Sequence, residues 1–184
     1  LRSEIANRQL VDGKVKPDYA ARGITRQVFP EPYLFSVYIN VADPLVGGMA
    51  SERVALRRAM ALAVDVDTLI KVVYAGQALP ANQLVPPRVT GHDPALPPRP
   101  RHDHVTANAL LDRFGYGKRD PDGYRRAPDG KPLTLTMSLR TAAISRELQT
   151  LWKKDMDAIG LRMKYRLTPF QEVIKELEAG NFQL

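Results

Sequence analysis

The last third of the chain has the clearest alternation of apolar and polar residues. Residues 133–139 (LTLTMSL) place leucine or methionine at every odd position and threonine or serine at every even one. This period of two predicts a strand with one buried face. Residues 161–167 (LRMKYRL) alternate in the same way. Between them, residues 143–160 carry apolar side chains at helical spacing and end in glycine, which predicts an amphipathic helix. Strand, helix and strand together predict a βαβ unit with parallel strands.

The rest of the chain contains weaker signals of the same two kinds. Residues 33–41 (YLFSVYINV) are rich in β-branched and aromatic residues and predict a strand. Ser51 is an expected helix N-cap. A proline-rich stretch, 79–101, predicts a long loop. The other predicted elements are helices at 52–64, 68–76, 106–116 and 170–180, an extended segment at 24–29, two Asp-Gly turns of a hairpin within 117–132, and the start of a third strand at 181–184. The predicted fold class is α/β.

Three cations of the second strand raise the question of an acidic partner. Arg162, Lys164 and Arg166 alternate with apolar residues, and the chain has a formal net charge of +7. Such a strip binds nucleic acid in some proteins. The cations of this chain are spread along the sequence rather than clustered, and no nucleic-acid recognition motif accompanies them. We therefore interpret the three side chains as the solvated face of a strand.

Catalytic and metal-binding patterns are not visible in the sequence. The chain has no cysteine and only three histidines, His92, His102 and His104. A zinc site needs at least three converging ligands, so these histidines are interpreted as surface residues. No phosphate-binding glycine loop or nucleophile motif occurs. The sequence predicts no catalytic residue, no metal site and no cofactor, and it favours ligand binding without chemistry.

A parallel sheet also predicts where a ligand would bind. Ligands of open α/β sheets contact the loops at the carboxyl ends of the strands. In this sequence those ends carry Arg140 and Thr141 after the first strand, and Thr168 and Phe170 after the second. Arg140 suits a carboxylate and Phe170 suits an apolar wall. A surface arginine and a core phenylalanine are the alternative readings of these two residues.

Several ordered motifs resemble one protein family. Residues 55–87 (ALRRAMALAVDVDTLIKVVYAGQALPANQLVPP) are similar to a conserved stretch of the family 5 extracellular solute-binding proteins, the periplasmic dipeptide and oligopeptide receptors of ABC importers. Residues 106–116 and 151–163 resemble two later stretches of the same family. The matching positions in the first stretch are Arg57, Ala59, Ala63, Asp65, Leu69, Ile70, Gly76, Pro80, Ala81, Pro86 and Pro87.

The resemblance implies a two-lobed receptor that holds a solute, expected to be a peptide, between its lobes. Residues 29–184 are then expected to form most of the second lobe, incomplete at its C-terminus, and residues 1–28 an arm that belongs with the first lobe. Residues 33–40 are expected near the crossing between the lobes, which adds Tyr33 and Asn40 to the candidate ligand-binding residues. Thr141 departs from an aromatic residue that the family has near this position.

The same resemblance implies the partners and the location. The expected partners are a peptide or another small solute, the membrane permease of an ABC transporter and the first lobe of the same protein, with no nucleic acid. The expected location is the periplasm, although no signal peptide is visible in residues 1–10. A basic α/β module that binds nucleic acid or an acidic protein remains the alternative hypothesis.

Overall fold

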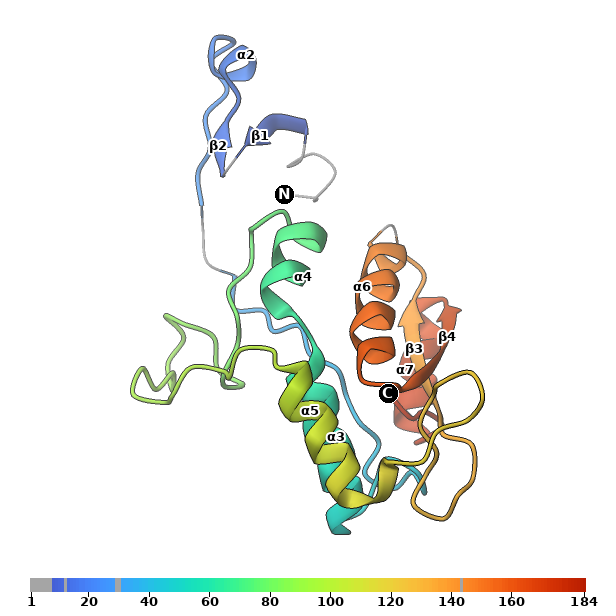
Figure 1. Ribbon diagram of the computed structural model, residues 1–184. Helices are drawn as coiled ribbons and strands as arrows, with labels where there is room; N and C mark the ends of the chain where they lie inside the picture. Colours follow the sequence, from blue (N-terminus) through green and yellow to red (C-terminus); the bar gives the residue numbers. More distant parts are fainter. Residues whose placement is uncertain (1–7, 12, 29–30, 143) are drawn as a thin grey trace. The chain divides into compact units, whose positions relative to one another are not determined.

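The computed structural model describes residues 8–11, 13–28, 31–142 and 144–184. The chain forms two compact units (Figure 1). The first combines Leu1–Ser36 with Val66–Pro100, and the second combines Val37–Asp65 with Arg101–Leu184. The predicted arm at 1–28 and lobe at 29–184 are parts of a two-lobed receptor, and this division stays a prediction. No helix in the described part of the chain is long and apolar enough to cross a membrane.

The first unit contains little regular structure. Gly76, at a φ of +71°, ends its longest helix by donating its N–H to the carbonyl of Ile70 at 3.0 Å, as the sequence predicts. Residues 79–101 form the expected loop without a helix or strand. The elements of this unit are β1 (Leu10–Val11), β2 (Lys14–Val15), α2 (Pro17–Ala20) and α4 (Val66–Val73), with β1 and β2 paired antiparallel.

The prediction of a strand at 33–41 is wrong. Residues 31–40 have no regular secondary structure. Consecutive side chains such as Val37 and Tyr38 are both exposed, so neither face of the segment is buried. A strand requires a neighbour along its length. Among the described residues, this segment makes a backbone bond to a distant part of the chain only at its end, where the N–H of Asn40 donates to the carbonyl of Gln183 at 3.0 Å. Residues 24–28 also lack strand pairing, and Phe29 lies outside the described residues.

The second unit contains a pair of helices side by side, α3 (Ser51–Ala63) and α5 (His104–Leu111) (Figure 1). Ala55, Leu56 and Ala59 of α3 are buried, which agrees with the apolar second half of this predicted helix. The predicted N-cap is wrong by one residue: Ala50 is the N-cap, and Ser51 is the first helical residue. α5 continues into an irregular turn, η1 (Asp112–Tyr116), in which Gly115 has a φ of +93°.

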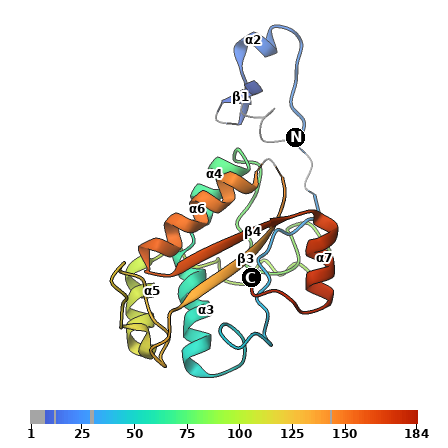
Figure 2. The ribbon, with the colours of Figure 1, turned by 90° about the vertical axis from the view of Figure 1, so that its right-hand side faces the viewer.

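A parallel βαβ unit forms the other half of the second unit. Strands β3 (Thr134–Arg140) and β4 (Arg162–Thr168) pair parallel from Thr134 opposite Arg162 to Arg140 opposite Thr168. Helix α6 (Ser145–Ala158) connects them and runs alongside the pair (Figures 1 and 2). The predicted strands, their direction and their connection are therefore confirmed, while Ala143, the first residue of the predicted helix, lies outside the described residues.

The expected burial of the two strands is confirmed in the first part of each strand, whereas Leu139 and Tyr165 are half-buried. Leu133, Leu135 and Met137 are at most 2% exposed, so one face of β3 lies in the core. Leu167 on β4 is instead 50% exposed, although the alternation predicts burial. The reason is its place at the end of the strand, where α6 has only begun and covers less of the sheet. Trp152 of α6 is half-buried rather than buried.

Helix α7 (Phe170–Glu178) follows β4 directly, as predicted. Its Glu176 contacts Ser138 and Arg166, which belong to the polar faces of β3 and β4. Beyond α7, the N–H of Leu184 donates to the carbonyl of Thr136 at 3.2 Å, and the carbonyl of Leu184 accepts from the N–H of Ser138 at 2.9 Å. These two bonds are the pattern by which one residue of a parallel strand pairs with its neighbour, here β3. Of the third strand predicted at 181–184, only Leu184 pairs in this way.

Candidate functional site

The carboxyl ends of β3 and β4 meet at one edge of the sheet. Arg140 and Thr168 are paired in register. Just beyond them, the N–H of Thr141 donates to the carbonyl of Thr168 at 2.8 Å. Phe170 begins α7 two residues later. The structure thus brings together four of the six predicted site residues: Arg140, Thr141, Thr168 and Phe170.

The side chains at this edge combine one charge with apolar surface. Arg140 is exposed and makes no ion pair with any other described residue. Phe170 is 57% exposed and Leu167, three residues earlier, is 50% exposed. The hydroxyl of Thr168 is buried and has no hydrogen-bond partner among the described residues. The edge therefore offers a cation for an anionic group and, at Phe170 and Leu167, exposed apolar side chains.

The other two predicted site residues are placed differently. The side-chain amide of Asn40 donates to the carbonyls of Gly180 and Phe182 at 2.9 and 2.8 Å, and its oxygen accepts from the N–H of Ala42 at 3.0 Å. These bonds use both amide protons, so they favour a structural role. Tyr33 belongs to the first unit, where its ring meets Phe35 edge-on with the centroids 5.8 Å apart.

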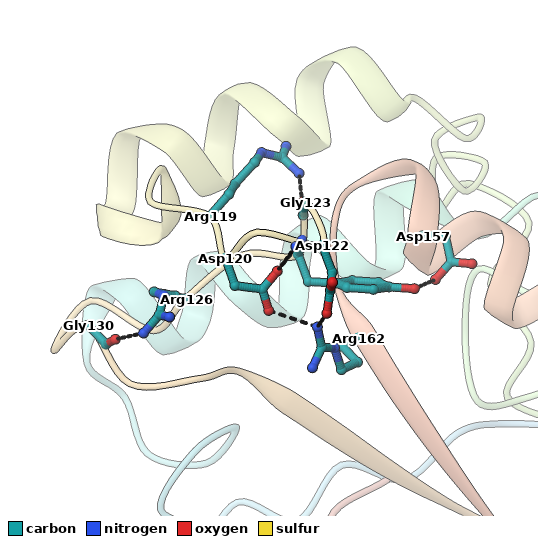
Figure 3. A network of polar contacts seen from close by, with 9 residues as sticks. Arg119, Asp120, Asp122, Gly123, Arg126, Gly130, Asp157 and Arg162 are labelled. Carbon is teal, nitrogen blue, oxygen red and sulfur yellow. Dashed lines mark hydrogen bonds and ion pairs between the residues drawn. The ribbon is translucent and has the colours of Figure 1, made fainter.

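The cations of β4 are largely used within the molecule (Figure 3). Arg162 pairs with Asp120 at 2.8 Å and with Asp122 at 3.0 Å, and its guanidinium carbon lies 4.6 Å from the centre of the Tyr124 ring. Figure 3 shows this arginine directed toward both carboxylates of the hairpin. Arg166 pairs with Glu176 of α7. Two of the three positive charges are therefore neutralised by acidic side chains of the same molecule. This agrees with the interpretation as a solvated strand face and disfavours binding of a polyanion such as nucleic acid.

Sequence reasoning missed a buried arginine in the hairpin. Arg125 is 1% exposed. Its guanidinium donates to the carbonyls of Ile159 and Tyr116 at 2.7 and 2.8 Å. It also contacts the side chains of Asp112 and Asn108. Two Asp-Gly turns indicate the hairpin but not which of its arginines points inward, because that depends on segments far away in the sequence.

The three histidines are not all surface residues. His92 is half-buried in the first unit, with Nδ1 2.9 Å from the carbonyl of Val85. His104 is half-buried in the second unit, with Nε2 2.9 Å from the carbonyl of Ala63 and 3.7 Å from the Asp155 carboxylate. Only His102 is exposed, as expected. Among the described residues, no three acidic, histidine or cysteine side chains form a group that could hold a metal ion.

One groove of the second unit lies over the polar faces of β3 and β4. It has a volume of about 410 Å³ and is lined in part by Asp43, Ser138, Arg166 and Gln183. The Asp43 carboxylate accepts from two backbone N–H groups and from Gln183, while Ser138 and Arg166 bond to Glu176. The charged groups that line it are thus already paired, which favours a structural role.

The parallel βαβ unit, with a third chain segment pairing beside β3, defines an α/β lobe of the periplasmic-binding-protein type. Residues 4–184 match the family described as bacterial extracellular solute-binding proteins, family 5, middle part. The chain belongs to this family.

Relatives and solved structures agree with this assignment. Di/tripeptide-binding protein 2 of Pseudomonas aeruginosa (strain UCBPP-PA14) is 29% identical over 131 residues, which are 70% of this chain and 22% of that protein. NikA from Brucella suis, solved with Fe(III)-EDTA, is 26% identical with a TM-score of 0.64, over 76% of this chain and 28% of that one.

A periplasmic oligopeptide-binding protein from Thermotoga maritima is 21% identical with a TM-score of 0.70 over 100% of this chain, a likeness of fold. The match extends over 37% of that chain. The present chain therefore spans about a fifth to a third of the length of these relatives.

Proposed function

We propose that this chain is part of the solute-binding receptor of an ABC importer, and that it holds its solute without chemical change. The observation that carries the proposal is the meeting of two parallel strand ends at one edge, which carries Arg140, without an ion pair to any described residue, and the exposed Phe170. Thr141 and Thr168 complete this edge. An edge of this kind is where open α/β sheets bind ligands.

The solute class that we propose is a peptide with a free carboxylate. The relative from Pseudomonas aeruginosa is named for di- and tripeptides, and another similar structure is an oligopeptide-binding protein. Arg140 supplies a guanidinium for a carboxylate, and Phe170 with Leu167 supplies apolar surface for a side chain. Asn40 and Tyr33 remain candidates for contacts near the crossing between the lobes.

The location and partners that we propose rest on the family. Its members are extracellular solute-binding proteins, and we propose a periplasmic location for this one. The proposed protein partners are the membrane permease and the first lobe of the same receptor. A cleft needs two walls to remove water from a ligand. The 184-residue chain alone is therefore expected to give no saturable heat with millimolar dipeptide in calorimetry.

Calorimetry on the full-length protein tests the proposal. Dialanine should bind, and dialanine amide, which lacks the free carboxylate, should bind weakly. Arg140→Met should weaken dialanine binding by about 10- to 100-fold, the value of a charge-assisted hydrogen bond. Lys164→Met is the matched control, because this lysine is an exposed cation on β4 away from the strand end. Equal affinities of wild type and Arg140→Met would refute the assignment of this edge.

A further inference from the structure

Ser145 makes an unusual bond at the start of α6. Its side chain is 5% exposed, one of the few buried polar residues of the described chain. The hydroxyl donates to the carbonyl of Arg140 at 2.6 Å, and the N–H of the same serine donates to the carbonyl of Ala142 at 3.1 Å. Ser145 therefore ties the beginning of the helix to the last residue of β3.

The Ser145 hydroxyl does not cap the helix, as a serine near a helix start often does. Such a hydroxyl commonly accepts a hydrogen bond from an N–H of the first turn. In α6 the N-cap is Ile144, and no described side chain caps the helix. The Ser145 hydroxyl is directed back to the strand instead, so the helix start is left without a cap while the strand end is held.

We infer that Ser145 is a positioning residue for the solute edge, acting through Arg140. The inference rests on the proposed function. The guanidinium of Arg140 has no partner among the described residues, so the contacts that place this residue are those of its backbone. Two bonds fix that backbone region: the serine hydroxyl on the Arg140 carbonyl, and the N–H of Thr141 on the carbonyl of Thr168 at 2.8 Å. Ser145 thereby fixes the backbone position from which the Arg140 side chain reaches toward a carboxylate, which removes the backbone part of the ordering cost of binding.

Amide hydrogen exchange of the full-length protein without ligand tests the first step. Ser145→Ala should raise the exchange rate of the Thr141 N–H by about tenfold, the effect of losing one hydrogen bond. Ser145→Thr keeps the hydroxyl and should restore the protection. Thr150→Ala is the matched control, because this α6 hydroxyl donates to the carbonyl of Arg146 at 2.9 Å, within the helix, and not to the strand.

Dialanine binding to the same variants tests the second step. Ser145→Ala should weaken binding by about fivefold when Arg140 is present, and should have no further effect in an Arg140→Met background. A residue that only stabilises the fold would weaken binding equally in both backgrounds. The double-mutant comparison therefore separates positioning from stability.

The possible results have distinct meanings. Faster exchange at Thr141, together with a binding loss that depends on Arg140, supports the inference. Unchanged exchange, or a binding loss that persists without Arg140, overturns it while the receptor assignment stands. A wild-type protein that binds no dialanine, although Ser145→Ala accelerates exchange, overturns the proposed solute class and with it the role of Ser145 in binding.

Discussion

Replacement of Arg125 by methionine should destabilise the second unit more than any exposed charge change. The arginine is 1% exposed and links three segments: it contacts Asn108 of α5, Tyr116 of η1 and the turn after α6, where its side chain bonds to Ile159 and its backbone to Gly160. Methionine fills much of the same space but donates no hydrogen bond. The buried carbonyls of Ile159 and Tyr116 then lose their donors.

The size of the effect follows from these contacts. Breaking a buried ion pair by removing one partner costs about 3–5 kcal/mol. Asp112, the acidic partner of Arg125, is 59% exposed, so water can solvate its carboxylate after the change. The expected cost is therefore at the lower end, about 3 kcal/mol. With a urea m-value of about 2 kcal/mol/M, the unfolding midpoint should fall by about 1.5 M.

Urea denaturation followed by fluorescence measures this shift, because Trp152 on α6 is the single tryptophan of the chain. The matched control is Arg126→Met, which removes the neighbouring arginine and its side-chain hydrogen bond to the carbonyl of Gly130 at 3.0 Å. That variant should lose about 1 kcal/mol or less. If the two variants unfold at the same urea concentration, the reasoning about the buried guanidinium is wrong.

Two further predictions concern α5 and the core. Asp103 caps α5, and the hydrogen bonds from the Thr106 side chain and backbone N–H hold the pKa of its carboxylate below the ordinary value. A carboxylate whose pKa is lowered in the folded state stabilises the protein above its unfolded pKa of about 3.9, and this stability is lost as the pH falls through the folded pKa. Between pH 5 and 2, the urea midpoint should therefore fall more steeply for wild type than for Asp103→Asn. Parallel curves for the two proteins would contradict this. Leu135→Ala should lower the free energy of unfolding by about 2–5 kcal/mol, because this side chain is fully buried. Leu167→Ala, at a position that is 50% exposed, should lower it by about 1 kcal/mol or less in the same urea assay. Similar losses at both positions would refute the burial argument.

Local patterns of the sequence were sufficient for the βαβ unit. The alternation in 133–139 and 161–167 and the helical spacing between them depend on neighbours two to four residues apart, and β3, α6 and β4 confirm them within two residues. Gly76 was predicted as the end of α4 from local sequence too, because glycine readily adopts the positive φ that commonly ends a helix. The rule for parallel sheets then placed Arg140 and Phe170 at one edge.

The strand predicted at 33–41 failed for a different reason. Its composition is that of a strand, but pairing requires a neighbour, and no propensity scale contains that information. Burial of Arg125 was likewise invisible, because its partners Asn108 and Ile159 lie 17 and 34 residues away.

The amino-acid sequence by itself determined where the main helices and the two parallel strands form and which face of each is apolar, since these depend on short-range spacing. Only the tertiary structure decided which polar groups meet: Arg162 with two hairpin aspartates, Asn40 with the carbonyls near the end of the chain, and Ser145 with the end of β3. Such contacts depend on the relative placement of distant segments, and a hydrogen bond forms only when donor and acceptor come within about 3 Å of each other.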